Sequence, residues 1–329
     1  MSEPLSVLLI GCGDIAGGFD ERGDQETVKS HAGAFTKDLR FSLDACVEPN
    51  AKRRAEFMAH WGINKGYEDV ESCIASEGRF DVVSVCVPTG IHGRVLVDLL
   101  PTQPRFVFCE KPLTGEVEYS KRIVEAYEAQ SVPLAVNYTR RWDPRISALR
   151  DELASGNWGE LQGVTGLYAK GLLNCGSHFF DILHFLIGPL TPRVLLHRVD
   201  DGRIEDPTLS VFLETSTGAP VTLIGTKHQN FFLFEITLLM GVGQLSIENL
   251  GQRLRLRRVH SHPHFPDRLT LDEGKWEDTE MKNSLMHTLD NIYRHLTMNE
   301  PLMSNGRSAL QVEEVYAQIM ALKIGEEGL

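Results

Sequence analysis

Short apolar runs alternate with amphipathic stretches through the first part of the chain. The apolar runs predict strands over residues 6–10, 42–47, 82–87, 105–109 and 134–137. Between them, apolar positions at helical spacing predict helices over residues 50–61, 70–76, 93–100 and 116–129. Strands that alternate with helices are typical of βαβ units, whose right-handed crossovers build a doubly wound parallel sheet. We therefore predict an α/β domain over residues 1–143.

The pattern changes after residue 143. A helix is predicted over residues 143–154, with Pro144 in its first turn and Gly156 just past its end. Strand-like runs then follow one another, several of them separated by turn glycines, over residues 162–168, 194–198, 208–214, 221–226, 235–240 and 244–248. Two helices close the chain, over residues 284–298 and 307–323; we interpret the Met-rich first one as ordinary core packing. Residues 144–329 are therefore predicted to form an α+β domain with an open, mainly antiparallel sheet.

Composition limits the partners. The 329 residues are 42% hydrophobic and 24% charged, as in a soluble globular protein, and carry a formal net charge of −12. This acidic balance argues against nucleic acid or an anionic membrane as the main partner. The first strand begins at once without the features of a secretory signal, and no apolar run approaches the roughly 20 residues of a membrane span. The six cysteines contain no C-x-x-C pair, so we expect a reducing cytoplasmic environment.

One histidine-rich stretch imitates a metal site. The segment H-S-H-P-H over residues 260–264 places histidines at alternate positions, as metal ligands on a strand would be. However, Pro263 and Pro266 predict a loop rather than a strand. We therefore predict no metal site.

The first strand ends in G-C-G-D-I-A, which matches the dinucleotide fingerprint G-x-G-x-x-G/A. Gly11 permits the tight turn, Gly13 lets the backbone approach a pyrophosphate, and Ala16 keeps the following helix close to the strand. Asp14 and Ile15 lie within the same turn and complete the predicted cofactor contacts of this segment. Since the motif directly follows a strand and opens a βαβ domain, it predicts a Rossmann dinucleotide-binding domain.

Glu48 ends the second strand and is the acid that such domains use to bind the adenosine ribose. It lies 37 residues after Gly11, further than usual, because of an insertion over residues 17–30 that is rich in Gly, Asp and Glu. A carboxylate at this place repels a 2′-phosphate, so NAD is favoured over NADP. Three basic residues follow closely and weaken the predicted preference for NAD over NADP: Lys52, Arg53 and Arg54.

The fifth strand runs straight into an acid, a base and a proline, Glu110, Lys111 and Pro112. Pro112 has no N–H to donate and ends the strand. Ligands of open α/β sheets bind beyond the carboxyl ends of the strands, so this is a candidate site of chemistry. The stretch alone is equally compatible with a salt-bridged strand end.

The fourth strand leads to the same edge of the sheet. Pro88 ends it, and Thr89 and His92 fall on the loop and helix start that would border a cofactor. The alternative is that His92 merely caps the next helix, and the sequence leaves this open.

The segment over residues 168–188 combines a helix with polar residues at one end. Asn174 and His178 are four residues apart, and His178 and Asp181 three apart, so all three can converge on one point. A single histidine beside an apolar face is usually a satisfied core residue. Here the polar cluster at the helix N-terminal end favours a substrate site. The helix itself is indicated by an apolar stripe of Phe179, Ile182, Leu183 and Leu186.

Taken together, these motifs and N-Y-T-R-R-W-D-P over residues 137–144 resemble the Gfo/Idh/MocA oxidoreductase family over almost the whole chain. K-G-x-x-x-x-G-S-H over residues 170–178 is most similar to the branch found in bacterial surface-sugar biosynthesis. The resemblance implies an N-terminal Rossmann domain, a C-terminal open sheet often used in dimerisation, a nicotinamide cofactor and a carbohydrate or cyclitol substrate.

The resemblance also implies residue roles. Lys111 matches the catalytic lysine, which stabilises the developing alkoxide, and a non-trans Lys111–Pro112 bond is a further hypothesis. His178 matches the acid/base histidine, which takes and returns the hydroxyl proton. Asn174 stands where several members carry Asp, so proton transfer is left to His178 and Lys111. Glu110 and Arg141 are expected on the cofactor side.

We therefore expect an NAD-dependent dehydrogenase or ketoreductase acting on a small-molecule sugar, nucleotide-linked as in the branch that it resembles. A non-catalytic NAD- or sugar-sensing regulator is an alternative that the retained Lys111 and His178 argue against. A glycoside hydrolase that keeps NAD bound throughout is a second alternative. We expect assembly as a homodimer or a dimer of dimers.

Overall fold

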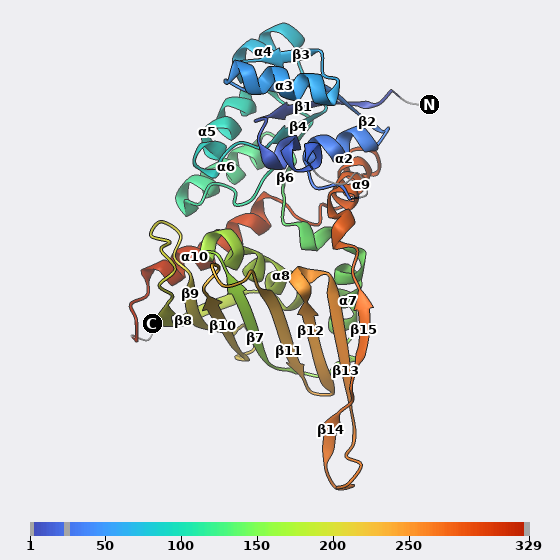
Figure 1. Ribbon diagram of the computed structural model, residues 1–329, viewed down its shortest axis with the longest axis vertical. Helices are drawn as coiled ribbons and strands as arrows, with labels where there is room; N and C mark the ends of the chain where they lie inside the picture. Colours follow the sequence, from blue (N-terminus) through green and yellow to red (C-terminus); the bar gives the residue numbers. More distant parts are fainter. Residues whose placement is uncertain (1–2, 23–26, 326–329) are drawn as a thin grey trace. The chain divides into compact units, whose positions relative to one another are not determined.

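The computed structural model describes residues 3–22 and 27–325, which form two compact units, drawn in Figure 1. The first unit contains the chain up to Trp142 together with Lys282–Gln311. The second contains Asp143–Met281 and the chain from Val312 onward. The sequence division had assigned residues 282–311 to the second half, whereas this segment packs within the first unit.

The first unit is built on a six-stranded parallel sheet in the order β3-β2-β1-β4-β5-β6. This is the doubly wound Rossmann arrangement predicted above, and the strand order reverses between β1 and β4. The central strands are buried on both faces, which explains their continuous apolar runs. The strands are β1 (Leu5–Ile10), β2 (Phe41–Val47), β3 (Lys65–Tyr67), β4 (Val82–Val85), β5 (Phe106–Cys109) and β6 (Leu134–Val136).

Seven α-helices among the described residues accompany this sheet: α1 (Phe19–Glu21), α2 (His31–Lys37), α3 (Ala51–Trp61), α4 (Val70–Glu77), α5 (Thr89–Leu99), α6 (Val117–Ala129) and α9 (Ser284–Met298). Helix α9 explains why residues 282–311 belong to the first unit. Its stripe of Leu285, Leu289 and Ile292 is buried in one cluster with Phe35 of α2 and Trp142. The predicted core role of this helix is confirmed: Met286 also packs against the cluster, whereas Met298 at the end of the helix is 69% exposed.

The helix that follows the glycine motif is interrupted. A π-helical turn (Asp14–Gly18) leads into the short α1, and a regular helix begins again only at α2. The Asp20 carboxylate accepts hydrogen bonds from the N–H groups of Lys29 and Ser30, and the Ser30 hydroxyl caps α2 at the N–H of Gly33. Asp20 thus ties together the two ends of the predicted insertion, of which residues 23–26 lie outside the described residues.

The second unit is built on a nine-stranded sheet in the order β14-β13-β12-β11-β7-β10-β9-β8, with β15 paired to β13. Among the described strands of this sheet, only β7 and β10 pair in parallel, so the prediction of a mainly antiparallel sheet is confirmed. The strands are β7 (Leu161–Ala169), β8 (Leu190–Arg198), β9 (Leu209–Thr215), β10 (Pro220–Thr226), β11 (Phe234–Met240), β12 (Gly243–Glu248), β13 (Arg253–Ser261), β14 (Leu269–Leu271) and β15 (Lys275–Asp278).

Three helices accompany this sheet in the described part of the unit: α7 (Pro144–Ala154), α8 (Ser177–Ile187) and α10 (Gly306–Ala321), the last of which begins in the segment assigned to the first unit. Helix α8 packs closely on β7. A Cβ added at Gly166 of β7 would lie 1.8 Å from the ring of Phe179 of α8, so the close contact depends on the glycine.

Strands β3, β13, β14 and β15 were not predicted. The predicted loop at residues 260–264 was wrong at its start, since His260 and Ser261 pair with Thr270 and Leu269 as the last residues of β13. Pro263 follows that pairing and lies outside the strand.

Candidate active site

A cavity of about 1520 Å³ opens at the carboxyl ends of the first unit's strands. It is lined by the ends of β1, β2 and β4 and by parts of α4 and α5. This position coincides with the reversal of strand order, where open α/β sheets bind their ligands. The predicted cofactor residues that line it are Gly11, Gly13, Asp14, Ile15, Glu48 and Pro88.

The two glycines of the fingerprint have different reasons to lack a side chain. Gly11 has a φ of +90°, and a Cβ there would lie 2.9 Å from the carbonyl oxygen of Cys86. Gly13 meets nothing within 4 Å of an added Cβ, so the space beside its backbone is open. A flat backbone surface beside a large cavity fits the close approach of a pyrophosphate. Ala16 is fully buried behind the turn, as the fingerprint requires.

Glu48 is hydrogen-bonded directly to this turn. Its carboxylate accepts the N–H of Cys12 at 3.1 Å and the N–H of Asn50 at 3.0 Å, so its orientation is set by two backbone groups. Arg53 lies 3.6 Å from the same carboxylate, and both side chains line the cavity. The acid is therefore positioned on the cavity wall, with a basic neighbour that the sequence had indicated.

Lys111 follows β5, the strand next to β4. The N–H of Glu110 donates to the carbonyl of Val85 at 3.0 Å, which joins the two strand ends directly. The Lys111–Pro112 peptide bond is cis, as hypothesised from the sequence. Glu110 is 9% exposed, and its carboxylate accepts hydrogen bonds from His31 and Asn137. The strand end is thus a buried polar network beside the cavity, and His31 is a member that sequence reasoning did not single out.

Three other predicted cofactor residues do not line the cavity. Thr89 is the first residue of α5. His92 is 1% exposed, and its ring nitrogens lie 2.8 Å from the carbonyl oxygens of Val87 and Pro112, so it bridges two strand-end loops rather than capping α5. Arg141 is 7% exposed, and its guanidinium lies 3.5 Å from the carbonyl of Met303.

In the second unit the predicted substrate residues lie in α8 and in the turn that precedes it. A π-helical turn (Leu172–Gly176) carries Asn174 and leads directly into α8, where His178 is the second residue. Asn174 and His178 are half-buried, and Asp181 is 1% exposed. The four residues of the predicted apolar stripe are all buried.

Asp206 holds this turn in place and was missed in the sequence. Its carboxylate accepts the N–H groups of Leu173 at 2.7 Å and Asn174 at 3.1 Å. The guanidinium of Arg203 is 3.0 Å from the same carboxylate. Gly171, with a φ of +86°, is required here because a Cβ would lie 1.9 Å from Asp206. The sequence carries the pattern G-x-x-N over residues 171–174, just ahead of the helix. This pattern does not indicate which distant acid binds the turn.

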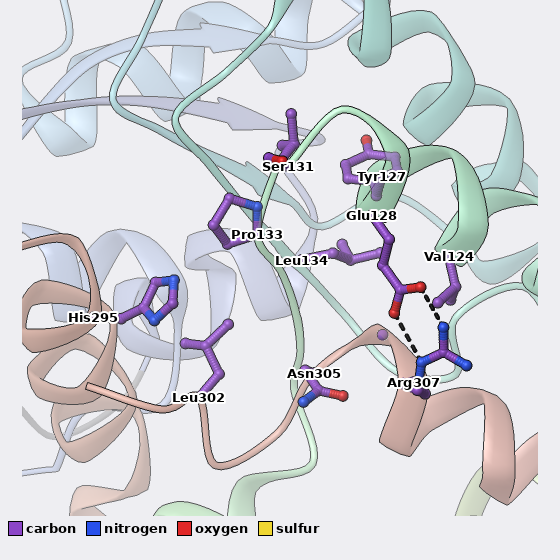
Figure 2. A pocket seen from close by; sticks show the side chains of 12 residues that line it. Val124, Tyr127, Glu128, Ser131, Pro133, Leu134, His295, Leu302, Asn305 and Arg307 are labelled. Atoms are coloured by element: carbon purple, nitrogen blue, oxygen red, sulfur yellow. Dashed lines mark hydrogen bonds and ion pairs between the residues drawn. The ribbon is translucent and has the colours of Figure 1, made fainter. Parts of the chain in front are cut away.

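A second cavity in the first unit, of about 410 Å³, lies between α6, β6 and the segment that contains His295 and Leu302 (Figure 2). Its two charged side chains already pair, since Arg307 donates to Glu128 at 2.8 Å. None of the predicted site residues, all of which are described, lines it. We therefore do not assign the site to this cavity.

Residues 3–22 and 27–325 also lack two other features. No group of three or more His, Cys, Asp and Glu side chains in these ranges could hold a metal ion. In the same ranges, no helix combines the length and the hydropathy required to traverse a lipid bilayer.

The chain is similar in sequence to known dehydrogenases. The chain is 29% identical over 236 residues to inositol 2-dehydrogenase of Corynebacterium glutamicum, a match that covers 68% of this chain and 64% of that protein. It is 25% identical to D-apiose dehydrogenase of Rhizobium rhizogenes, over 74% of this chain and 73% of that protein. The chain thus spans slightly less than two thirds of the length of the first of these relatives.

The fold extends to solved structures at low identity. WlbA dehydrogenase from Bordetella pertussis, crystallised with NADH and UDP-GlcNAcA, superposes with a TM-score of 0.79 at 19% identity, over 97% of this chain and 96% of that one. Residues 5–138 match the model of the oxidoreductase family with an NAD-binding Rossmann fold. This match covers strands β1 to β6, so the first unit is similar to the Gfo/Idh/MocA oxidoreductase family.

Proposed function

We propose that the protein is an NAD-dependent dehydrogenase or ketoreductase that acts on a hydroxyl or ketone of a sugar or cyclitol. The observation that carries this proposal is the cavity at the strand reversal, with Glu48 on its wall and Lys111 at the end of the adjoining strand. The relatives named above as inositol and apiose dehydrogenases support the same class of substrate. When bound, NAD supplies the hydride acceptor.

The roles proposed for the chain's own residues follow from their chemistry. The Lys111 ammonium stabilises negative charge that develops on the substrate oxygen. The His178 imidazole takes the hydroxyl proton during oxidation and returns it during reduction. Asn174 can orient the substrate through its amide but cannot carry the proton. Asp181, buried in the same helix, completes the proposed substrate-side group.

On the cofactor side we propose that Gly11, Gly13 and Glu48 contact NAD directly, with NADP bound less well. Four other predicted cofactor residues do not line the cavity, so their proposed role is to support the residues that contact NAD: Thr89, His92, Glu110 and Arg141. A nucleotide-linked sugar is the finer proposal for the substrate. Its support is the motif over residues 170–178 and the fold shared with WlbA.

A substrate panel tests the proposal. The purified chain is incubated with NAD and a series of cyclitols, free sugars and nucleotide sugars, and free NADH is followed by its absorbance. Accumulation of NADH with at least one polyol is the expected result. Binding of NAD without turnover of any member would instead support a sensor. A hydrolysed glycoside without free NADH would support a hydrolase that retains its cofactor.

We also propose a homodimer or a dimer of dimers, formed through the outer face of the second unit's sheet. Leu238 of β11 and Leu223 of β10 are fully buried, while their neighbours Leu239 and Ile224 are 43% and 39% exposed. Because successive side chains of a strand point to opposite faces, these two leave apolar surface on the outer face. Light scattering at micromolar concentration should report a dimer or tetramer, and Leu239→Asp should shift it toward monomer. A wild-type monomer would contradict the proposal.

The six cysteines are buried and stand outside disulfides, which supports the proposal that the protein works in the reducing cytoplasm.

A further inference from the structure

A buried histidine lies behind the strand end that carries Lys111. His31, the first residue of α2, is 0% exposed, and its ring stacks on Phe108 of β5 with centroids 4.6 Å apart. Its Nδ1 lies 2.7 Å from the hydroxyl of Ser84, and its Nε2 lies 2.9 Å from Oε1 of Glu110. Both ring nitrogens therefore have a partner in the interior of the first unit.

Glu110 connects this histidine to the lysine. Oε1 accepts from His31 and from the Asn137 amide, the latter at 2.5 Å. Oε2 lies 3.3 Å from the backbone N of Lys111 and accepts its N–H. The carboxylate thus joins α2 and the residue after β6 to the peptide group of Lys111. A shift of the carboxylate would be transmitted to the lysine through this bond.

The partners of the ring suit the imidazolium form. The Glu110 carboxylate can only accept, so Nε2 donates to it. The Ser84 hydroxyl can accept from Nδ1 and can donate its own hydrogen to the sulfur of Cys86, 3.7 Å away. Burial alone lowers the pKa of His31, but Cys86 and Glu110 raise it to about 10. Burial alone raises the pKa of Glu110, but His31, Asn137 and Lys111 outweigh it, and the pKa is lowered.

We propose that His31 is a positioning residue, the internal counter-ion of Glu110, which holds the Glu110 carboxylate and through it the Lys111 peptide. The proposal rests on the role of Lys111 proposed above. Removing one member of a buried ion pair leaves the other charge uncompensated. In a His31 variant the cation adjacent in sequence is Lys111, whose charge already interacts with Glu110. The lysine is then drawn toward the carboxylate and away from the substrate.

Three variants separate this charge effect from simple loss of packing. In His31→Gln, kcat should fall by about 10- to 100-fold, because a misplacement of about 1 Å in a catalytic group has this effect. The NAD dissociation constant should change by less than about twofold, since His31 does not line the cavity. In the double variant His31→Gln with Glu110→Gln, the uncompensated charge is gone, so kcat should recover at least about tenfold over His31→Gln.

The control is Tyr127→Phe. Tyr127 is 1% exposed in the same unit and donates to the carbonyl of Leu96 at 2.8 Å, so this variant also loses a buried hydrogen bond but no charge. Its melting temperature should fall while kcat stays at the wild-type value. Near-normal kcat in His31→Gln, or a double variant no faster than His31→Gln, would overturn the proposal.

A readout without turnover keeps the inference separate from the proposed activity. In protein labelled with ¹⁵N-histidine, the His31 signals are assigned by their loss in His31→Gln. Both ring nitrogens should be protonated at about pH 8, where an ordinary histidine with a pKa of about 6.5 is neutral. A neutral ring at that pH would overturn the counter-ion role even in an active enzyme. A charged ring in a chain that turns over no polyol would refute only the dehydrogenase.

Discussion

The two groups of proposed site residues are held in place in different ways. In the first unit, the cofactor residues stand at the carboxyl ends of neighbouring parallel strands, where hydrogen bonds such as Glu110 N–H to Val85 fix them. In the second unit, Asn174 stands on a turn that is anchored by Asp206, 32 residues away in sequence, and His178 follows in the helix that the turn leads into. The first arrangement follows from topology, whereas the second depends on one long-range side chain. We therefore expect that substitutions at Glu48 change NAD binding, and that substitutions around the Asn174 turn change the reaction with the substrate.

The largest loss of turnover without a matching loss of NAD affinity is expected for the two proposed catalytic residues. His178→Ala should lower turnover by about 100- to 10,000-fold, because the proton acceptor is lost. Lys111→Ala should lower it by about 100-fold or more, because a cation aimed at the developing oxyanion is lost. NAD affinity should change little in either variant.

The pH–rate profile sharpens this test. With Asn174 unable to share the proton, the wild type should show a limb near the imidazole pKa of about 6.5. Single-turnover rates and NAD dissociation constants of the folded variants provide the measurement. If His178→Ala kept near-normal turnover and the same limb, the proton path would run elsewhere.

Asp206→Ala should have the next largest effect. It removes the acceptor of the Leu173 and Asn174 N–H groups, so the turn that presents Asn174 loses its anchor. Hydrogen bonds to a charged group contribute about 1.5–3 kcal/mol, which predicts a loss of about tenfold or more in kcat/KM for the substrate. The exposed Asp267 of the same unit provides the control Asp267→Ala, which should be neutral. A weakened NAD affinity in Asp206→Ala would break the distinction between the two regions.

Glu48 should show the opposite selectivity. The wild type should bind NAD at least about tenfold better than NADP, about 1.4 kcal/mol, and Glu48→Ser should narrow that gap. Because Glu48 belongs to the cofactor side alone, kcat at saturating NAD should stay close to wild type. Isothermal titrations with both dinucleotides measure the effect. Equal affinities in the wild type would contradict the assignment of Glu48.

The smallest expected effect is on stability. Since the pKa of His31 is raised to about 10, its ion pair contributes stability that is fully present below about pH 6.5 and is lost as pH rises toward 10. The titratable groups that face it are Cys86, Glu110 and, beyond Glu110, Lys111. The difference in unfolding free energy between wild type and His31→Gln should therefore shrink over this range. A pH-independent difference between about pH 6.5 and 10 would argue against a charged His31.

Much of the fold could be predicted from patterns that are local in sequence, and so could the proposed site residues at the strand ends and at the start of α8. A parallel strand buried on both faces must be apolar throughout, so β1, β4 and β5 were recognisable, and the polar residues after them had to meet at one edge. The fingerprint turn and the helix of His178 likewise carry their signals within a few residues. Strand β13 was missed because arginines alternate with its leucines, the buried Leu254 and the half-buried Leu256, and because pairing rather than hydrophobicity defines its end.

The sequence by itself determined the parallel and antiparallel halves, the glycine turn, the positions of Glu48 and Lys111 after their strands, and the helix that carries His178. Only the tertiary structure decided that α9 packs with α2 in the first unit, that Asp206 anchors the Asn174 turn, and that His31 faces Glu110. The physical reason is the range of the interactions. Hydrophobic periodicity and turn chemistry act over a few residues, whereas the partner of a buried charge is selected by folding from anywhere in the chain, and His31 lies 79 residues from its carboxylate.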